Sequence, residues 1–299
     1  MVDVSNGCLA GKAIAFVGSG IMAEAMIQVL VREGLVAPEH ICASGPREER
    51  ALELRRRYGV VGTTDNRAAT EAADLLVLSV KPQVLPTVLQ ELKGLVYSEG
   101  LVLSIVAGMN VATIASGLDH PAVVRAMPNT PAQVGEGMTV WTASQATNEA
   151  QRAQARALLN AMGREVYVED ENMLDMATAV SGTGPTYVFL MMEALTDAAV
   201  HLGFSRRVAE ELVTQTVVGS ASFARQSERH LAEMRNMVTS PGGTSAEAIY
   251  QLEKGGLRTV LSKAVWAAYQ KSKLLGQANY TARGPSSLRD TEDEEQRRT

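Results

Sequence analysis

The sequence predicts an α/β N-terminal domain on a doubly wound, mostly parallel sheet, followed by an all-α C-terminal domain. The first domain is predicted because short aliphatic runs alternate with helical stretches up to about residue 170. The first of these runs also ends in the glycines of "AFVGSGIMAEAM". The second domain is predicted because residues 172–276 contain long helical stretches and no strand-like run.

The strands of the first domain are predicted wherever aliphatic or β-branched residues cluster between turn signals. They are residues 12–18, 40–45, 74–80, 100–107, 122–128, 136–143 and 165–170. The intervening patterns favour helices at residues 20–34, 47–57, 82–93, 110–117 and 148–162.

The C-terminal helices are broken at glycine- or serine-containing segments, which are residues 181–185, 202–205, 240–245 and 253–256. The helix that begins near Pro185 is apolar on most sides and needs an intersubunit interface to bury it. The last helix shows the spacing of one buried face, formed by Leu257, Val260, Leu261, Ala264, Val265 and Ala268. We therefore predict domains at 1–170 and 171–277, and a disordered tail at 278–299.

The composition excludes some classes of function. Lys and Arg total 28 against 33 Asp and Glu, so no basic field attracts nucleic acid. The two cysteines, Cys8 and Cys42, have no metal-ligand spacing. The N-terminus has no apolar segment typical of a signal peptide, and the most apolar helix carries Glu193, Asp197 and His201. We expect a cytoplasmic protein with no membrane partner and no metal, although those three side chains share a helix face.

The pattern Gly18-x-Gly20-x-x-Ala23 follows a predicted strand and opens a predicted helix. In dinucleotide-binding proteins the first glycine allows the tight turn, and the second lets the pyrophosphate approach the backbone at the helix N-terminus. The alternative is a strand that merely ends in glycines. The alternating strands and helices around the motif favour the dinucleotide site.

The end of the second predicted strand should select the cofactor. It carries Ser44, Arg47 and Arg50, where NAD enzymes usually have a carboxylate for the ribose hydroxyl. A hydroxyl and two guanidiniums suit a 2′-phosphate, so NADP(H) is preferred and NAD(H) is possible. The alternative is an ordinary solvated helix start.

Further candidates follow other strands. Lys81 in "SVKPQ" could face the cofactor or solvent, and Asn129 and Thr130 in "AMPNTPA" could form a site or only a turn.

In "TSPGGTSAEAI", Thr244 and Glu247 have capping-box spacing, which predicts a helix with Thr244 as its N-cap. Serine hydroxyls and helix amides there could also bind a carboxylate.

The segments "FVGSGIMAEAM", "VKPQ", "MPNTPAQVGEG", "SGTGPTYVF" and "VTSPGGTSAEAI" occur in the order and spacing seen in pyrroline-5-carboxylate reductases. The chain resembles this family over about residues 12–275, and the last two motifs are quite specific to it. The resemblance implies a Rossmann domain, a helical domain that interlocks in a homodimer, and frequent assembly into decamers. It implies hydride transfer from NAD(P)H to the cyclic imine of 1-pyrroline-5-carboxylate, which yields L-proline in the last step of proline biosynthesis.

The resemblance also assigns site residues by position. Ser44 would lie at the 2′-phosphate, and Asn66 and Lys81 on the adenosine side. The expected cofactor-binding residues are Gly18, Gly20, Ile21, Met22, Ser44, Arg47, Asn66, Val80, Lys81, Pro82, Ala107, Gly108, Asn129 and Thr130. The expected substrate-binding residues are Ser240, Gly243, Thr244 and Ser245.

Ser245 is the expected catalytic residue, because it stands where the family usually has threonine beside the substrate's ring nitrogen. Serine keeps the hydroxyl but loses the methyl group that restricts the rotamer. Two other functions stay open. One is a related NADP-dependent imine or carbonyl reductase that acts on another small acid, and the other is a non-catalytic NADP-sensing protein.

Overall fold

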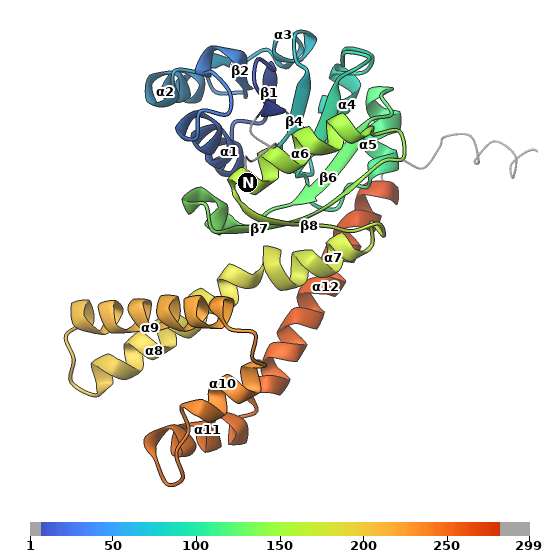
Figure 1. The fold of residues 1–299 in the computed structure, drawn as a ribbon. Coiled ribbons are helices and arrows are strands. Elements are labelled where there is room, and N and C mark those ends of the chain that lie inside the picture. The colour runs from blue at the N-terminus through green and yellow to red at the C-terminus, as the bar shows by residue number, and fades with distance from the viewer. Residues whose placement is uncertain (1–6, 282–299) are drawn as a thin grey trace, which may run out of the picture. The chain divides into compact units, whose positions relative to one another are not determined.

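The computed structural model describes residues 7–281, which form two compact units (Figure 1). Within these residues, one unit comprises residues 7–182 and 268–281, and the other comprises Thr183–Ala267. The domain boundaries given above stay predictions.

The first unit contains an eight-stranded sheet with the order β3-β2-β1-β4-β5-β6-β7-β8. All neighbouring strands are parallel except β6 and β7, which confirms the predicted doubly wound, mostly parallel sheet. The strands are β1 Ile14–Val17, β2 Ile41–Ser44, β3 Val61–Thr63, β4 Leu75–Leu78, β5 Leu101–Ser104, β6 Val123–Met127, β7 Gly137–Ala143 and β8 Gly163–Tyr167.

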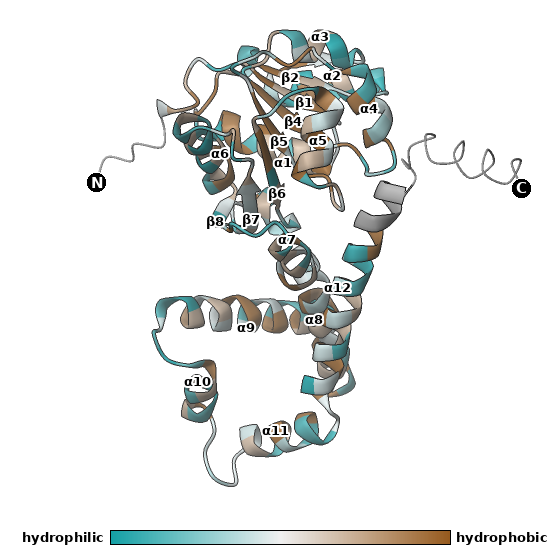
Figure 2. Cartoon of the chain, turned by 90° about the vertical axis from the view of Figure 1, so that its right-hand side faces the viewer, coloured by the Kyte–Doolittle hydropathy of each residue, from teal (hydrophilic) through white to brown (hydrophobic). Residues whose placement is uncertain are grey.

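Helices cover both faces of the sheet, so its central strands are buried on both sides. Along β1, Ile14 and Phe16 enter one core with α1 and α6, while Ala15 and Val17 enter the other with α4 and α5. Figure 2 shows these hydrophobic strands in brown between the helices. The elements are α1 Ile21–Arg32, η2 Pro38–His40, α2 Glu48–Tyr58, α3 Asn66–Glu71, α4 Leu85–Glu91, α5 Val111–Leu118, η3 Thr130–Val134, α6 Glu149–Ala161, α7 Met173–Ala177 and the π-helical turn η4 Thr178–Gly182.

One strand and one α-helix of this unit are absent from the sequence prediction, namely β3 and α3, as are the short 3-10 turns η2 and η3. Strand β3 lies at the edge of the sheet, where it pairs only with β2. Its central residue is Gly62, and a Cβ there would come within 2.4 Å of the Ala51 carbonyl oxygen. The glycine that permits this close packing also makes the segment resemble a loop in the sequence.

The second unit is helical and holds α8 Gly184–His201, α9 Arg206–Gln226, α10 Leu231–Met237, α11 Thr244–Lys254 and the first part of α12 Leu257–Thr281. Thr196 is the buried residue of α8, whereas Phe189 and Leu190 are 61% and 66% exposed. The predicted buried face of the last helix is wrong for a single chain, because Leu257, Val260 and Leu261 are exposed.

The last helix also runs further than predicted. Residues 278–281 belong to α12, which corrects the start of the predicted disordered tail. Residues 282–299 of that tail lie outside the described residues. Across residues 7–281, no helix combines the length and apolarity needed to span a membrane.

Candidate active site

The glycine turn after β1 is fixed between the ends of β2 and β4. The Gly18 N–H donates to the Ser44 carbonyl at 3.0 Å, and the Ser79 hydroxyl donates to the Gly18 carbonyl at 2.7 Å. Gly18 has φ 104°, and a Cβ there would lie 2.6 Å from the Val80 nitrogen. Only glycine fits this position without displacing the backbone.

Gly20 differs from Gly18 because its side-chain position is open. It is the N-cap of α1 with φ −80°, and a Cβ there would meet nothing within 4 Å. No side chain caps α1, so the first amides of the helix, including those of Ile21 and Met22, are left for another acceptor. Open space beside uncapped amides fits the pyrophosphate of a dinucleotide.

The sheet brings the other predicted cofactor loops to the same edge. In the register of the parallel strands, Val17 is paired with both Ser44 and Leu78, and Leu78 is paired with Ser104. The segments that follow β1, β2, β4 and β5 therefore lie side by side at the carboxyl edge, where such sheets bind ligands. Ser44 ends β2, and the segments that follow these strands hold Gly18, Gly20, Arg47, Val80, Lys81, Pro82, Ala107 and Gly108.

Ser44 lies at the predicted place, but its hydroxyl is turned inward. The side chain is fully buried, and its Oγ donates to Asn66 Oδ1 at 2.8 Å. Asn66 in turn donates from Nδ2 to Glu91 Oε2 at 2.9 Å. A contact between the Ser44 hydroxyl and a 2′-phosphate stays a prediction, and it would require this side chain to leave Asn66.

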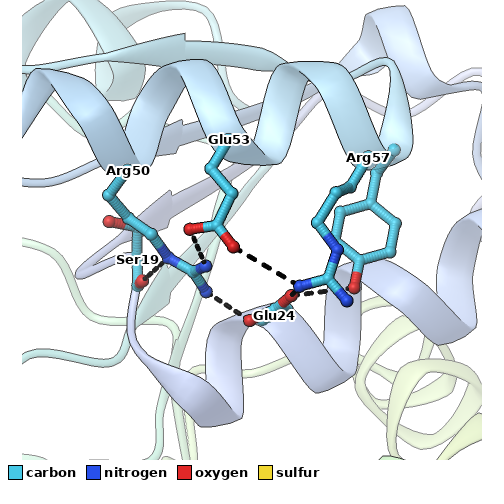
Figure 3. Close-up of polar contacts among 6 residues, drawn as sticks. Ser19, Glu24, Arg50, Glu53 and Arg57 are labelled. Atoms are coloured by element: carbon cyan, nitrogen blue, oxygen red, sulfur yellow. Dashed lines mark hydrogen bonds and ion pairs between the residues drawn. The ribbon is translucent and has the colours of Figure 1, made fainter.

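The two arginines after β2 occupy different surroundings. Arg47 is exposed and, within residues 7–281, its guanidinium forms no ion pair. Arg50 is instead bonded to the Ser19 carbonyl, Glu24 and Glu53 (Figure 3). The expectation of two guanidiniums free for a phosphate is therefore corrected to one, since Arg50 already has partners.

Glu24 anchors this arrangement from α1. Burial opposes its ionisation, but hydrogen bonds from Arg50 and Tyr58 and the charges of Arg50 and Arg57 outweigh burial and lower its pKa. The Arg57 Nη1 and Tyr58 hydroxyl lie 2.6 and 2.9 Å from Glu24 Oε1. Glu24 therefore stays ionised at neutral pH and holds α2 against the start of α1.

Asn129 and Thr130 follow β6 at the same carboxyl edge, because β6 is parallel to β5. The Asn129 side chain bonds to the protein on both sides. Its Nδ2 donates to the Ser181 carbonyl at 3.0 Å, and its Oδ1 accepts from the Met138 N–H at 2.8 Å. This amide thus ties the loop to β7 and η4, while its expected contact with the cofactor stays a prediction.

The predicted substrate residues lie together in the second unit, between α10 and the first turn of α11. The Gly243 N–H donates to the Ser240 carbonyl at 3.0 Å, and a Cβ on Gly243 would lie 2.5 Å from Ser240 Oγ. Thr244 and Ser245 are the first two residues of α11. The structure therefore groups two glycines and three hydroxyl side chains at one helix start.

The predicted capping box at this helix is wrong. The N-cap is Gly243 rather than Thr244, and no side chain caps α11. The helix begins one residue earlier because the extended Gly243 already accepts a backbone bond from Glu247 at 3.3 Å. The first-turn amides of α11 are consequently uncapped, as a site for a carboxylate requires.

His120 and Asp197 already have partners within the protein. His120 is buried, and its Nε2 donates to the Gly100 carbonyl at 2.9 Å. Asp197, one of the acids on the apolar helix, pairs with Arg206 at 2.7 Å. In the part of the chain that the structure describes, no group of three His, Cys, Asp or Glu side chains could hold a metal ion.

Sequence reasoning missed the residues that shape the glycine turn. Ser79 follows β4 and binds the Gly18 carbonyl, and Glu24 lies one turn into α1, where it pairs with Arg50 of α2. Gly45 packs so closely that a Cβ would reach 2.4 Å from Ser19 Oγ. In the sequence, the one visible sign of this close packing is the glycine that follows β2.

Comparisons with known proteins agree with this geometry. Residues 171–275 match the family model described as pyrroline-5-carboxylate reductase dimerisation. Residues 13–108 match the model described as NADP oxidoreductase, coenzyme F420-dependent. The two models cover the helical segment and the first part of the sheet.

Individual relatives match almost their whole length. The pyrroline-5-carboxylate reductase of Synechocystis is 43% identical over 263 residues, covering 88% of this chain and 98% of the relative. The pyrroline-5-carboxylate reductase of Pseudomonas aeruginosa is 40% identical over 265 residues, covering 88% of this chain and 97% of the relative.

Solved structures give the same result. The enzyme from Coxiella burnetii is 38% identical with a TM-score of 0.82, and covers 88% of this chain and 98% of its own. The Plasmodium falciparum pyrroline carboxylate reductase, solved with NADP bound, is 30% identical with a TM-score of 0.82 and covers 89% and 98%. This chain belongs to the pyrroline-5-carboxylate reductase family.

Proposed function

We propose that this protein reduces 1-pyrroline-5-carboxylate to L-proline with NAD(P)H, the last step of proline biosynthesis. The observation that carries the proposal is the match to the Synechocystis enzyme over 88% of this chain and 98% of that relative. The residues matched by the two family models contain both glycine-led, uncapped helix starts, at α1 and at α11. One suits a pyrophosphate and the other suits the carboxylate of a small imino acid.

The chain's own residues would bind and orient the two reactants. When bound, the reduced nicotinamide supplies a hydride to the imine carbon. The first amides of α1 bind the pyrophosphate, and Lys81 and Asn66 lie on the adenosine side. The first-turn amides of α11, with Ser240, bind the substrate carboxylate.

Ser245 is the proposed catalytic residue. Its hydroxyl hydrogen-bonds the ring nitrogen, which carries the proton that becomes the N–H of proline. Because the substrate binds as the protonated imine, its nitrogen brings this proton from solvent. The protein then needs to supply the orientation of the two reactants and one hydrogen bond.

NADP(H) is the preferred coenzyme in this proposal, and NAD(H) is a possible second one. Support comes from Arg47, which is exposed and lacks an ion-pair partner within residues 7–281, and from the absence of a carboxylate at the end of β2. We further propose a cytoplasmic homodimer formed through the helical unit, with assembly of dimers into a decamer.

The test is coenzyme oxidation by the purified protein, followed by absorbance with and without 1-pyrroline-5-carboxylate. Turnover that depends on this substrate and yields proline supports the proposal. Turnover with a different imino or keto acid alone would establish the related reductase instead. Tight NADPH binding without turnover of any such acid would indicate a sensing protein.

A further inference from the structure

Arg50 lies in the first turn of α2 and reaches back to the start of α1 (Figure 3). Its Nε donates to the Ser19 carbonyl at 3.1 Å, and its Nη1 donates to Glu53 Oε2 at 2.7 Å. The remaining terminal nitrogen pairs with Glu24. Only 13% of the Arg50 side chain is exposed, so all its nitrogens serve this one arrangement.

The Ser19 carbonyl belongs to the peptide that joins the two halves of the glycine turn. It precedes the N-cap Gly20, whose own carbonyl accepts the first helical bond from Glu24. A carbonyl oxygen carries negative partial charge, and its orientation fixes that of the planar peptide. Arg50 therefore holds this oxygen against α2 and fixes the peptide that leads into the uncapped amides.

The charges of the cluster balance one another. Arg50 and Arg57 are paired with Glu24 and Glu53, so two cations meet two carboxylates. A phosphate that approached Arg50 would have to displace carboxylates already bound in good geometry. Arg47 differs, because it is exposed and forms no ion pair with a described residue.

We infer that Arg50 is a positioning residue for the pyrophosphate-binding turn, while Arg47 alone of the two arginines binds the 2′-phosphate. The inference rests on the proposed use of NAD(P)H. It predicts that Arg50 matters equally for NADPH and NADH, which share the pyrophosphate. Arg47 should matter only for ligands that carry a 2′-phosphate.

The experiment measures the dissociation constants of NADPH, NADH and adenosine 2′-monophosphate for the full chain by fluorescence or calorimetric titration. The third ligand carries the 2′-phosphate but no pyrophosphate. Arg50→Gln should weaken the binding of NADPH and of NADH by the same factor, roughly tenfold. It should leave the dissociation constant of adenosine 2′-monophosphate unchanged. Arg47→Gln is the matched control, and it should weaken NADPH and adenosine 2′-monophosphate while sparing NADH.

Arg50→Lys separates geometry from charge. Lysine keeps the positive charge but cannot contact Ser19, Glu24 and Glu53 with one planar fork. We expect it to weaken both coenzymes equally, as Arg50→Gln does. Unchanged binding of adenosine 2′-monophosphate shows in the same titration that each Arg50 variant is folded, and unchanged binding of NADH shows it for Arg47→Gln.

Two outcomes overturn the inference. One is a loss confined to NADPH and adenosine 2′-monophosphate in the Arg50 variants, which would make Arg50 a 2′-phosphate ligand. The other is unchanged affinity for both coenzymes. Failure of the proposed coenzyme use looks different, because the unsubstituted protein would then bind neither NADPH nor NADH. Failure of the proposed reaction alone would leave these titrations unchanged, because they measure binding and not turnover.

Discussion

Arg125 on β6 forms an ion pair with Glu171, with 2.9 Å between Nη1 and Oε1, although only 7% of the Arg125 side chain is exposed. The same Glu171 oxygen accepts the N–H of Val111 at the start of α5. The second terminal nitrogen of Arg125 faces Asp175 Oδ1 at 3.6 Å, and Asp175 accepts from Ser272 at 2.9 Å. One buried cation thus joins the sheet to α5, α7 and α12.

Replacing Arg125 by Met should lower the free energy of unfolding by about 3 kcal/mol, because removal of one partner leaves Glu171 and Asp175 without their cation. We expect the lower end of the range for buried pairs, since 30% of the Glu171 side chain is exposed. Urea unfolding at fixed protein concentration measures the change. A loss below about 0.5 kcal/mol would contradict this role.

The Asp74 carboxylate gives a pH-dependent contribution to stability. Burial raises its pKa, but hydrogen bonds from the Ala13 N–H at 2.8 Å and from Lys12 at 3.0 Å, with the Lys12 charge, lower it overall from 3.8. Because the folded pKa is depressed, the stabilisation is present above pH 3.8 and is lost as pH falls through the lower folded value. Asp74→Asn should flatten the pH dependence of the melting temperature in this acid range. An unchanged profile would show that Asp74 contributes nothing to it.

The helical unit should form at least a homodimer. Phe189 and Leu190 on α8 are 61% and 66% exposed in the single chain, within the segment that matches a dimerisation model. Light scattering should give a mass of at least two chains of 31.9 kDa.

Leu190→Asp should lower that mass by placing a charge in the interface. Tyr97→Glu is the control, since Tyr97 is 54% exposed on the other unit. Equal effects of the two substitutions would argue against this interface.

The sequence predicts most of the sheet because β1, β4 and β5 are buried on both faces and so read as continuous aliphatic runs. It does not predict β3, a three-residue edge strand with a glycine at its centre. The apolar face of α12 has a different reason, since periodicity predicts an apolar face but does not indicate what covers it.

The candidate site, like the fold, can be predicted from the sequence only in part. The positions of Gly18 and Gly20 follow from a local motif whose glycines have a steric reason. The Ser44–Asn66 and Arg50–Glu24 contacts join residues from different elements, and no local pattern encodes them. At α11 the motif predicts the helix, but the helix begins one residue earlier than the capping-box spacing indicates, because glycine can serve as N-cap without a side chain.

Ser245 and Thr244 should respond differently to removal of their hydroxyls. Neither caps α11, so Thr244→Ala should change the free energy of unfolding by less than about 0.5 kcal/mol. Ser245→Ala should lower kcat/KM for 1-pyrroline-5-carboxylate by roughly tenfold to a hundredfold through loss of one positioned hydrogen bond. Its melting temperature and NADPH affinity should stay unchanged, and Ser245→Thr should remain active. Full turnover by Ser245→Ala, or a loss explained by unfolding, would remove the proposed contact.

The two glycines of the turn offer a matched pair that separates folding from coenzyme binding. At Gly18, φ is 104° and a Cβ would lie 2.6 Å from the Val80 nitrogen, so Gly18→Ala should destabilise the fold by more than about 1 kcal/mol.

At Gly20, φ is −80° and a Cβ would meet no protein atom within 4 Å, so Gly20→Ala should keep the melting temperature. That methyl would nevertheless stand beside the uncapped amides of α1 and keep a pyrophosphate away from them. We therefore expect Gly20→Ala to weaken the binding of both NADPH and NADH by about tenfold or more, which corresponds to the loss of one charge-assisted hydrogen bond. Thermal unfolding and coenzyme titration of both variants provide the measurement. If Gly20→Ala binds coenzyme normally, the pyrophosphate does not lie at the start of α1.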